Sequence, residues 1–375
     1  MLKRSCTVTL NESDKAWVES VWMKLDKKRY QVSFSAYDKL PYTTENGVYS
    51  SAVNPWTSGF WPGMMWLMYV ETEKEQYRKT AEKAEQLLDK FLITPWKLGH
   101  DTGFVWHISS GVNYGLFQKE DSKTRLLFAA DHLASRYNCR GDYISSENAI
   151  EGRMIIDTMM NLPLLYLASE ITQQKRYQYI AEQHASRTIQ THIRQDGSVF
   201  HAIDLNPDTG ELVGYTRGQG YSEDSAWARG QTWALYGFTL SYIHSGKKEY
   251  LDVAKRVANF FIAAIADTYI PRVDLKAPAL EHDTTAGAIA ASGLIELANC
   301  VEEDEKHIYM EAAIKILRAM EEMYCDWSVK EESVLQQGVE KYFPEEYRKG
   351  HSIIYGDYFF TEAILKLKRN EYLFW

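Results

Sequence analysis

Residues 59–70 read GFWPGMMWLMYV, an almost wholly apolar stretch with no polar face. The next stretch, residues 75–92, has a different pattern, because Tyr77, Ala81 and Ala84 recur at three- and four-residue steps between charged positions. A helix that is apolar on every side is enclosed by other protein, whereas a helix with one apolar stripe lies at the surface. The two stretches therefore predict a hairpin of one buried helix and one surface helix.

The same alternation recurs along all 375 residues. Enclosed stretches begin at Gly59, Gly103, Asp157, Gln231, Thr284 and Asp357, and amphipathic stretches cover residues 13–30, 75–92, 122–138, 176–193, 248–265 and 302–324. Repetition of this kind indicates a repeat architecture. It predicts an all-α fold, a closed toroid of six helical hairpins forming one domain over residues 1–375, with parallel inner helices and antiparallel outer helices. An open solenoid is the alternative, although its repeats are usually more even in length.

Composition limits the partners of the chain. Acidic residues outnumber basic ones by 51 to 42, giving a formal charge of −9, so nucleic acid is not expected as a partner. No apolar run reaches the roughly 20 residues of a membrane-spanning helix, so no membrane segment is expected. The four cysteines are scattered and the first residues lack the apolar core of a secretion signal, which favours the cytoplasm. The expected assembly is a monomer or homodimer.

In a closed ring, all inner helices begin at the same end, so the loops before them converge on one mouth. Chemistry-bearing residues gather at these starts: Trp56, His100, Asp101, Asp157, Trp227, Arg229, Asp283 and Asp357. An aspartate at a helix start is ordinarily a cap. Several acids at one aromatic-lined mouth nevertheless favour carbohydrate chemistry, in which one group delivers a proton and a water is activated. We expect at least two of the acids to be catalytic.

Aromatic and loop residues complete the predicted mouth. Trp56 and Trp227 precede their helices and are the first candidates for stacking on a sugar ring, with Trp233 third. The loop of residues 194–224 is long for a connector, and we predict that it is functional and contains a short hairpin. Arg229 begins an apolar helix, where a guanidinium requires a partner, either a buried aspartate or a substrate carboxylate.

Sequence motifs of several enzyme classes are absent. The chain has no Gly-x-x-x-x-Gly-Lys, no dinucleotide-binding glycine pattern, no His-Glu-x-x-His and no Gly-x-Ser-x-Gly. Nucleotide-binding, zinc-protease and serine-hydrolase functions are therefore excluded.

Six short motifs resemble, in order and over nearly the whole chain, the unsaturated glucuronyl hydrolases of glycoside hydrolase family 88. They are residues 56–61 (WTSGFW), 100–104 (HDTGF), 153–165 (RMIIDTMMNLPLL), 227–238 (WARGQTWALYGF), 283–286 (DTTA) and 356–358 (GDY). The resemblance implies an (α/α)6 barrel, in agreement with the hairpin count, and a hydrolysis that needs neither cofactor nor metal. Family members remove the 4,5-unsaturated uronic acid that polysaccharide lyases leave at the non-reducing end of oligosaccharides.

The resemblance also implies roles for single residues. Asp157 matches the general acid/base that protonates C4 and helps water add to C5, and Asp101 matches the second essential acid. The expected substrate contacts are the aromatic and polar residues Trp56, His100, His201, Gln219, Trp227, Arg229 and Trp233. Two neighbouring carboxylates are expected to titrate as a coupled pair.

Alternatives to this activity remain open. The nearest is the related family 105, which acts on unsaturated galacturonyl products of pectin, and more distant ones are a sugar epimerase or a non-catalytic binding toroid. Two departures from the family pattern concern the preferred sugar. Gly218 stands where many members have a histidine, and the C-terminal part contains no Ser-x-x-Ser-x-Lys run of the kind that accompanies sulfated substrates.

Overall fold

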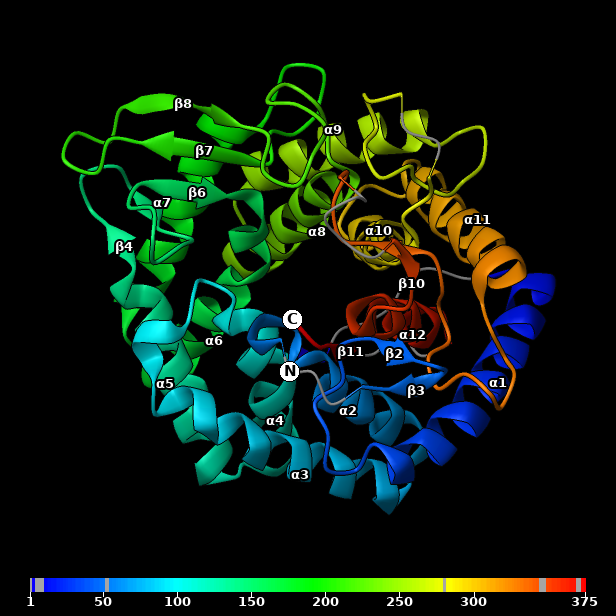
Figure 1. Ribbon diagram of the computed structural model, residues 1–375. Coiled ribbons are helices and arrows are strands. Elements are labelled where there is room, and N and C mark those ends of the chain that lie inside the picture. Colours follow the sequence, from blue (N-terminus) through cyan, green and yellow to red (C-terminus); the bar gives the residue numbers. More distant parts are fainter. Residues whose placement is uncertain (1, 4–9, 51–53, 279–280, 344–348, 369–371) are drawn as a thin grey trace.

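The computed structural model describes residues 2–3, 10–50, 54–278, 281–343, 349–368 and 372–375. Within these residues, the chain forms two concentric rings of helices (Figure 1). The inner ring contains α2 (Phe60–Thr72), α4 (Val112–Phe117), α6 (Leu162–Thr172), α8 (Ala228–Ser245), α10 (Thr284–Ala298) and α12 (Ile354–Lys368). The outer ring contains α1 (Glu12–Ser35), α3 (Glu75–Leu92), α5 (Glu120–Ser135), α7 (Lys175–His192), α9 (Lys248–Ala264) and α11 (Lys306–Tyr324). The predicted division into enclosed and amphipathic helices is confirmed.

The ring closes between its last and first inner helices. Helix α12 packs against α10 on one side and α2 on the other, and α1 covers α12 from outside. The sixth hairpin is therefore assembled from two distant parts of the sequence. An open solenoid would leave this edge uncovered, so the closed toroid is the correct alternative. No helix in the described ranges is long and apolar enough to cross a membrane.

Two inner segments begin irregularly. A π-helix, η3 (Gly103–Gly111), leads into α4, and a 3₁₀-helix, η4 (Ile156–Met160), leads into α6 after the single residue Asn161. The sequence predicted one apolar stretch at each place, without these breaks. Pro163 lies in the first turn of α6, where its missing N–H costs nothing but where it ends any helix running in from η4. The π-helical register of η3 has no signature in the apolar pattern.

The strands are short and belong to the segments before, between and after the helices. The largest sheet is three-stranded and antiparallel, with β7 (Ala202–Leu205) between β6 (Arg153–Ile155) and β8 (Leu212–Thr216). It confirms the predicted hairpin in residues 194–224. The remaining pieces are β1 (Leu2–Lys3), β2 (Thr44–Glu45), β3 (Val48–Tyr49), β4 (Tyr137–Asn138), β5 (Tyr143–Ile144), β9 (Gly338–Val339), β10 (Lys349–His351), β11 (Tyr372–Leu373), η1 (Pro55–Thr57) and η2 (Pro95–Lys97).

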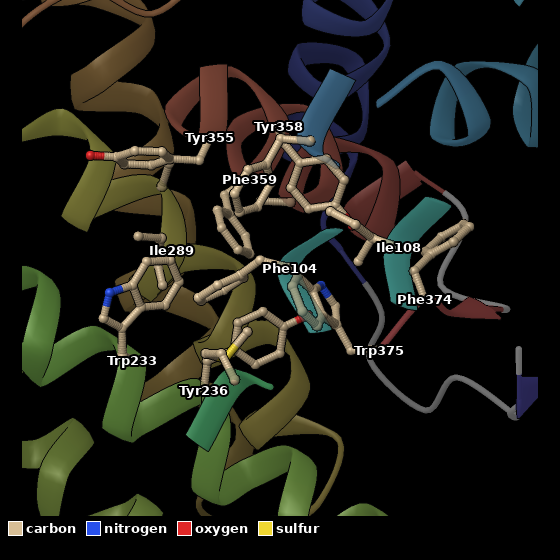
Figure 2. Close-up of a cluster of buried hydrophobic side chains, with 14 of the residues drawn as sticks. Phe104, Ile108, Trp233, Tyr236, Ile289, Tyr355, Tyr358, Phe359, Phe374 and Trp375 are labelled. Atoms are coloured by element: carbon tan, nitrogen blue, oxygen red, sulfur yellow. The ribbon is translucent and has the colours of Figure 1, made fainter. Parts of the chain in front are cut away.

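Aromatic side chains fill the interior of the ring (Figure 2). The ring of Trp375 stacks on Phe359 with centroids 5.8 Å apart and planes 8° from parallel. The ring of Trp233 lies 5.0 Å from that of Phe104. Such pairs add to the free energy gained by burying their area. The interior of the barrel is thus a packed core. A substrate would therefore bind at the end where the inner helices begin, and not inside the ring.

Candidate active site

The three-stranded sheet brings the first acid and its histidine together. Asp157 follows β6 and His201 precedes β7, and the backbone N–H of Ile156 donates to the carbonyl of His201 at 3.0 Å. The Asp157 Oδ1 atom consequently lies 3.5 Å from His201 Nε2. Neither of these two buried atoms has a hydrogen-bond partner among the described residues. The Asp157 side chain as a whole is 17% exposed.

The backbone at Gln219 determines the orientation of the His201 proton. The Gln219 N–H donates to His201 Nδ1 at 2.9 Å, and because an N–H can only donate, Nδ1 is the acceptor. The proton of the neutral imidazole therefore lies on Nε2, facing Asp157. Gly218 makes this bond possible, because its φ is +54° and a Cβ there would lie 1.9 Å from Nδ1. The departure from the family pattern at Gly218 thus has a local structural role.

The second acid, Asp101, also faces an imidazole. Its Oδ1 atom lies 3.4 Å from Nε2 of His100, whose Nδ1 hydrogen-bonds Thr158 Oγ1 at 2.7 Å. Burial raises the pKa of Asp101, nearby His100 lowers it, and the Asp157 carboxylate raises it further. The Asp157 carboxylate therefore acts electrostatically on Asp101.

Two cavities lie beside Trp56, which lines both of them. One, of about 200 Å³, is also lined by Asp101 and Trp106. The other, of about 270 Å³, is also lined by Gln219 and Arg229. Trp56 is only partly buried, and its ring lies 5.2 Å from that of Tyr355. Of the three predicted stacking tryptophans, Trp56 is the one with an accessible position at the mouth.

The structure corrects the placement of the other two tryptophans. Trp233 is 1% exposed and packs on Phe104 and Phe359 in the core (Figure 2). Trp227 is 2% exposed, and its ring is covered by the Arg229 guanidinium at 4.3 Å. Trp233 lies more than one helical turn below the start of α8, so the helix carries it beneath the mouth. Neither ring offers a free face to a sugar.

Arg229 has the buried aspartate partner that was one of its two predicted alternatives. Its Nη1 atom lies 2.6 Å from Asp283 Oδ2, and both side chains are almost completely buried. The same guanidinium donates to the carbonyls of Val339 and Glu340. The Gln219 side chain donates to the Glu340 carbonyl as well, at 2.7 Å. Arg229 and Gln219 therefore hold the segment around residue 340 beside the cavity that they line.

Asp283 and Asp357 are structural. Asp283 caps α10 by accepting from the Thr285 N–H, in addition to pairing with Arg229. Asp357 lies 2.7 Å from the buried guanidinium of Arg29 and also accepts from the hydroxyl of Tyr49 and from two backbone N–H groups. Both aspartates are fully buried. Of the four predicted acids, only Asp101 and Asp157 retain partly exposed carboxylates.

Several residues at the mouth were not predicted from the sequence. The cavity next to Arg229 is also lined by Tyr42, Asn54, Lys341 and Tyr355. Tyr355 lies in the first turn of α12, so its position at a helix start is a signal that the sequence contains. Tyr42 and Asn54 come from a segment before the first inner helix, which only tertiary folding brings here. In the described part of the chain, no group of three or more His, Cys, Asp or Glu side chains is arranged to hold a metal ion.

Comparison with known proteins gives a consistent result. Residues 29–268 match the model of Glycosyl Hydrolase Family 88. The chain is 31% identical over 363 residues to the unsaturated glucuronyl hydrolase of Bacillus sp. (strain GL1), covering 90% of this chain and 93% of that one. It is 32% identical over 336 residues to the unsaturated chondroitin disaccharide hydrolase of Streptococcus pneumoniae, covering 85% and 83% respectively.

A solved structure supports the same relationship. The unsaturated glucuronyl hydrolase of Streptococcus agalactiae superposes with a TM-score of 0.89 at 27% identity, over 100% of both chains. The fold, the six ordered motifs and the coverage of these relatives all agree: the chain belongs to glycoside hydrolase family 88.

Proposed function

We propose that this protein is an unsaturated glucuronyl hydrolase, which removes the 4,5-unsaturated uronic acid from the non-reducing end of lyase-generated oligosaccharides. The observation that carries the proposal is the pair Asp157 and Asp101, two partly exposed carboxylates that each face an imidazole Nε2. Relatives at 31% and 32% identity carry the names unsaturated glucuronyl hydrolase and unsaturated chondroitin disaccharide hydrolase. The proposal treats residues 1–375 as one catalytic domain.

The proposed reaction is a hydration. Protonated Asp157 gives its proton to C4 of the vinyl ether, and positive charge develops at C5. A water oxygen bonds to C5 and returns a proton to the Asp157 carboxylate, which leaves a hemiketal. The C5–O5 bond then breaks to give a ketone at C5 and a hemiacetal at C1, and the hemiacetal releases the remaining sugar as an alcohol. Atoms and electrons balance without a cofactor or metal.

The surrounding residues suit an anionic sugar. In this proposal Trp56 stacks on the sugar ring, and the cavity lined by Arg229 and Gln219 accepts the uronate. Because the net charge is −9, the protein must attract the anion through local cationic groups, such as Lys341 at the same cavity, and not through its overall field. We propose a cytoplasmic enzyme, a monomer or homodimer, that acts after a polysaccharide lyase.

The test is an assay with four substrate sets, the unsaturated disaccharides released by chondroitin, hyaluronan, heparin and rhamnogalacturonan lyases. Loss of the enol-ether ultraviolet absorbance reports hydration of the double bond. We expect turnover of glycosaminoglycan-derived disaccharides, fastest for unsulfated ones, since the sequence lacks the run that accompanies sulfated substrates. Turnover of the rhamnogalacturonan product alone would favour the family 105 activity instead, and no turnover of any substrate would contradict the proposal.

A further inference from the structure

One buried amide joins the two segments that carry the acids. Asn161 lies between η4 and α6 and is completely buried. Its Oδ1 atom accepts from the backbone N–H of Phe104 at 3.0 Å, in the first turn of η3. Its Nδ2 atom donates to the carbonyl of Asp157 at 3.3 Å. A single side chain thus contacts the backbone of the Asp157 segment and of the helix that follows Asp101.

The start of η3 depends on a cap from outside. The first N–H groups of a helix have no partner within it and are usually satisfied by a side chain just before the helix. Thr102, which occupies that position, makes no capping bond, and its Oγ1 has no partner among the described residues. Asn161 therefore supplies from a neighbouring inner segment the bond that the local sequence does not provide.

The contact requires the two backbones to approach closely. A Cβ at residue 103 would lie 2.6 Å from Asn161 Cα and 2.8 Å from Asn161 Oδ1, distances that real Cβ atoms do not show. Gly103 therefore lets η3 lie directly on Asn161. A second bond, from Thr158 Oγ1 to His100 at 2.7 Å, links the same two segments one turn away.

Asn161 also affects the pKa of Asp101, which burial raises above its ordinary value. A side-chain hydrogen bond from Asn161 lowers the pKa of Asp101, opposing the effects of burial and of the Asp157 carboxylate. The other titratable groups that affect Asp101 are His100, on its own segment, and Arg136, at the end of α5, and both lower the pKa of Asp101. Asn161 is the uncharged member of this set, so replacing it by an aspartate should raise the pKa of Asp101.

We propose that Asn161 is a positioning residue that holds Asp101 in place against Asp157. This role rests on the proposed function only in naming those two residues as the catalytic acids. It explains why a polar residue is completely buried between two inner segments. The residue itself contacts neither substrate nor reacting atoms in the proposed reaction.

The test compares Asn161→Asp with the wild type. This variant keeps the acceptor for Phe104, removes the donor to the Asp157 carbonyl and places a negative charge between the two segments that carry the acids. The pKa of Asp101, followed by carbon NMR of labelled aspartate against pH, should rise by about one unit, a tenfold change in its ionisation. The limb of the kcat/KM pH profile that Asp101 controls should move upward by the same amount.

Asn113→Asp is the matched control. Asn113 is 2% exposed on α4, and its amide donates to Glu85 Oε1 at 2.9 Å, so it is also a buried asparagine that serves a carboxylate. We expect this control to lower the unfolding temperature but to leave the titration of Asp101 and the pH profile unchanged. If Asn161→Asp does not fold, Asn161→Ser, which keeps a small donor and acceptor, is measured in the same way.

An Asp101 titration in the Asn161 variant equal to that of the wild type, with loss of stability alone, would overturn the proposal. The NMR titration needs no turnover, so it remains decisive even if the protein hydrates no unsaturated disaccharide. A failure of the proposed function is therefore distinguishable from a failure of the positioning role.

Discussion

Aspartates at the starts of inner helices fall into two pairs with opposite environments. Asp283 and Asp357 are fully buried, and every oxygen of both carboxylates accepts a hydrogen bond or ion pair. Asp101 and Asp157 are 25% and 17% exposed, and Asp157 Oδ1 has no partner among the described residues. The same residue type at the same kind of position is structural in one pair and available for chemistry in the other.

The difference comes from what covers each start. Backbone N–H groups of Val334, Leu335 and Val339 reach the carboxylates of Asp357 and Asp283, and two buried arginines complete their partners. At the start of η3, Asp101 instead lines one of the cavities beside Trp56, and at η4 the Asp157 Oδ1 atom has no hydrogen-bond partner among the described residues. The carboxylates that we propose to be catalytic are the ones that these segments and arginines do not enclose.

Asp157→Asn should have the largest effect on activity among these aspartates. Loss of the proton donor should lower kcat/KM about a thousandfold, within the usual range for general acid–base catalysis. The free energy of unfolding should change by no more than about 0.5 kcal/mol, because the Oδ1 atom has no partner to lose. Absorbance assays and urea denaturation measure the two quantities, and full activity in the folded variant would refute the catalytic role.

Asp357→Asn should show the reverse pattern. It leaves the guanidinium of Arg29, which is fully buried, without its counter-charge, and breaking such a pair costs about 3–5 kcal/mol of stability. The activity per folded molecule should remain. In the double variant Arg29→Met/Asp357→Leu the loss should be smaller, because no buried charge remains unpaired. A stability equal to the wild type in the single variant would contradict a structural role.

The two tryptophans Trp56 and Trp233 extend the comparison to aromatic residues. Trp56→Ala removes one face of the sugar site, worth about 1 kcal/mol, so KM should rise about fivefold with little change in stability. Trp233→Ala empties part of the core and should cost about 3–5 kcal/mol of stability. Steady-state kinetics and chemical denaturation separate the two effects. A tenfold rise in KM for a stable Trp233 variant would restore Trp233 to the substrate site.

The smallest expected effect concerns Asp101 and pH. Because the folded state raises the pKa of Asp101 above 3.8, this group favours folding below pH 3.8, and that contribution is lost as the pH rises through the folded pKa. Asp101→Asn should therefore raise the unfolding temperature at pH 7 by about 1–2 °C, although activity falls. Scanning calorimetry should show the difference disappearing near pH 3.8, and a lower unfolding temperature at pH 7 would contradict the sign.

Depth in the barrel was the main feature that the sequence did not reveal. Trp56 was predicted at the mouth because it precedes a helix, and it lies there. Trp233 was also predicted to stack on sugar, but its distance along α8 places it in the aromatic core (Figure 2). The π-helix before α4 and the bridge made by Asn161 were not predicted either, because a change of hydrogen-bond register and a contact between segments leave no periodic signal.

The sequence by itself determined the alternation of enclosed and amphipathic helices, the number of hairpins and the end at which the acids gather. Each of these follows from apolar spacing, which is a local property of the chain. Tertiary structure alone decided that Asp157 keeps an oxygen without a partner among the described residues, which imidazoles face the two acids and which amide bridges their segments. Whether a polar atom is satisfied depends on groups from distant segments, such as Arg29 for Asp357 and Asn161 for Phe104, and these meet only when the ring has closed.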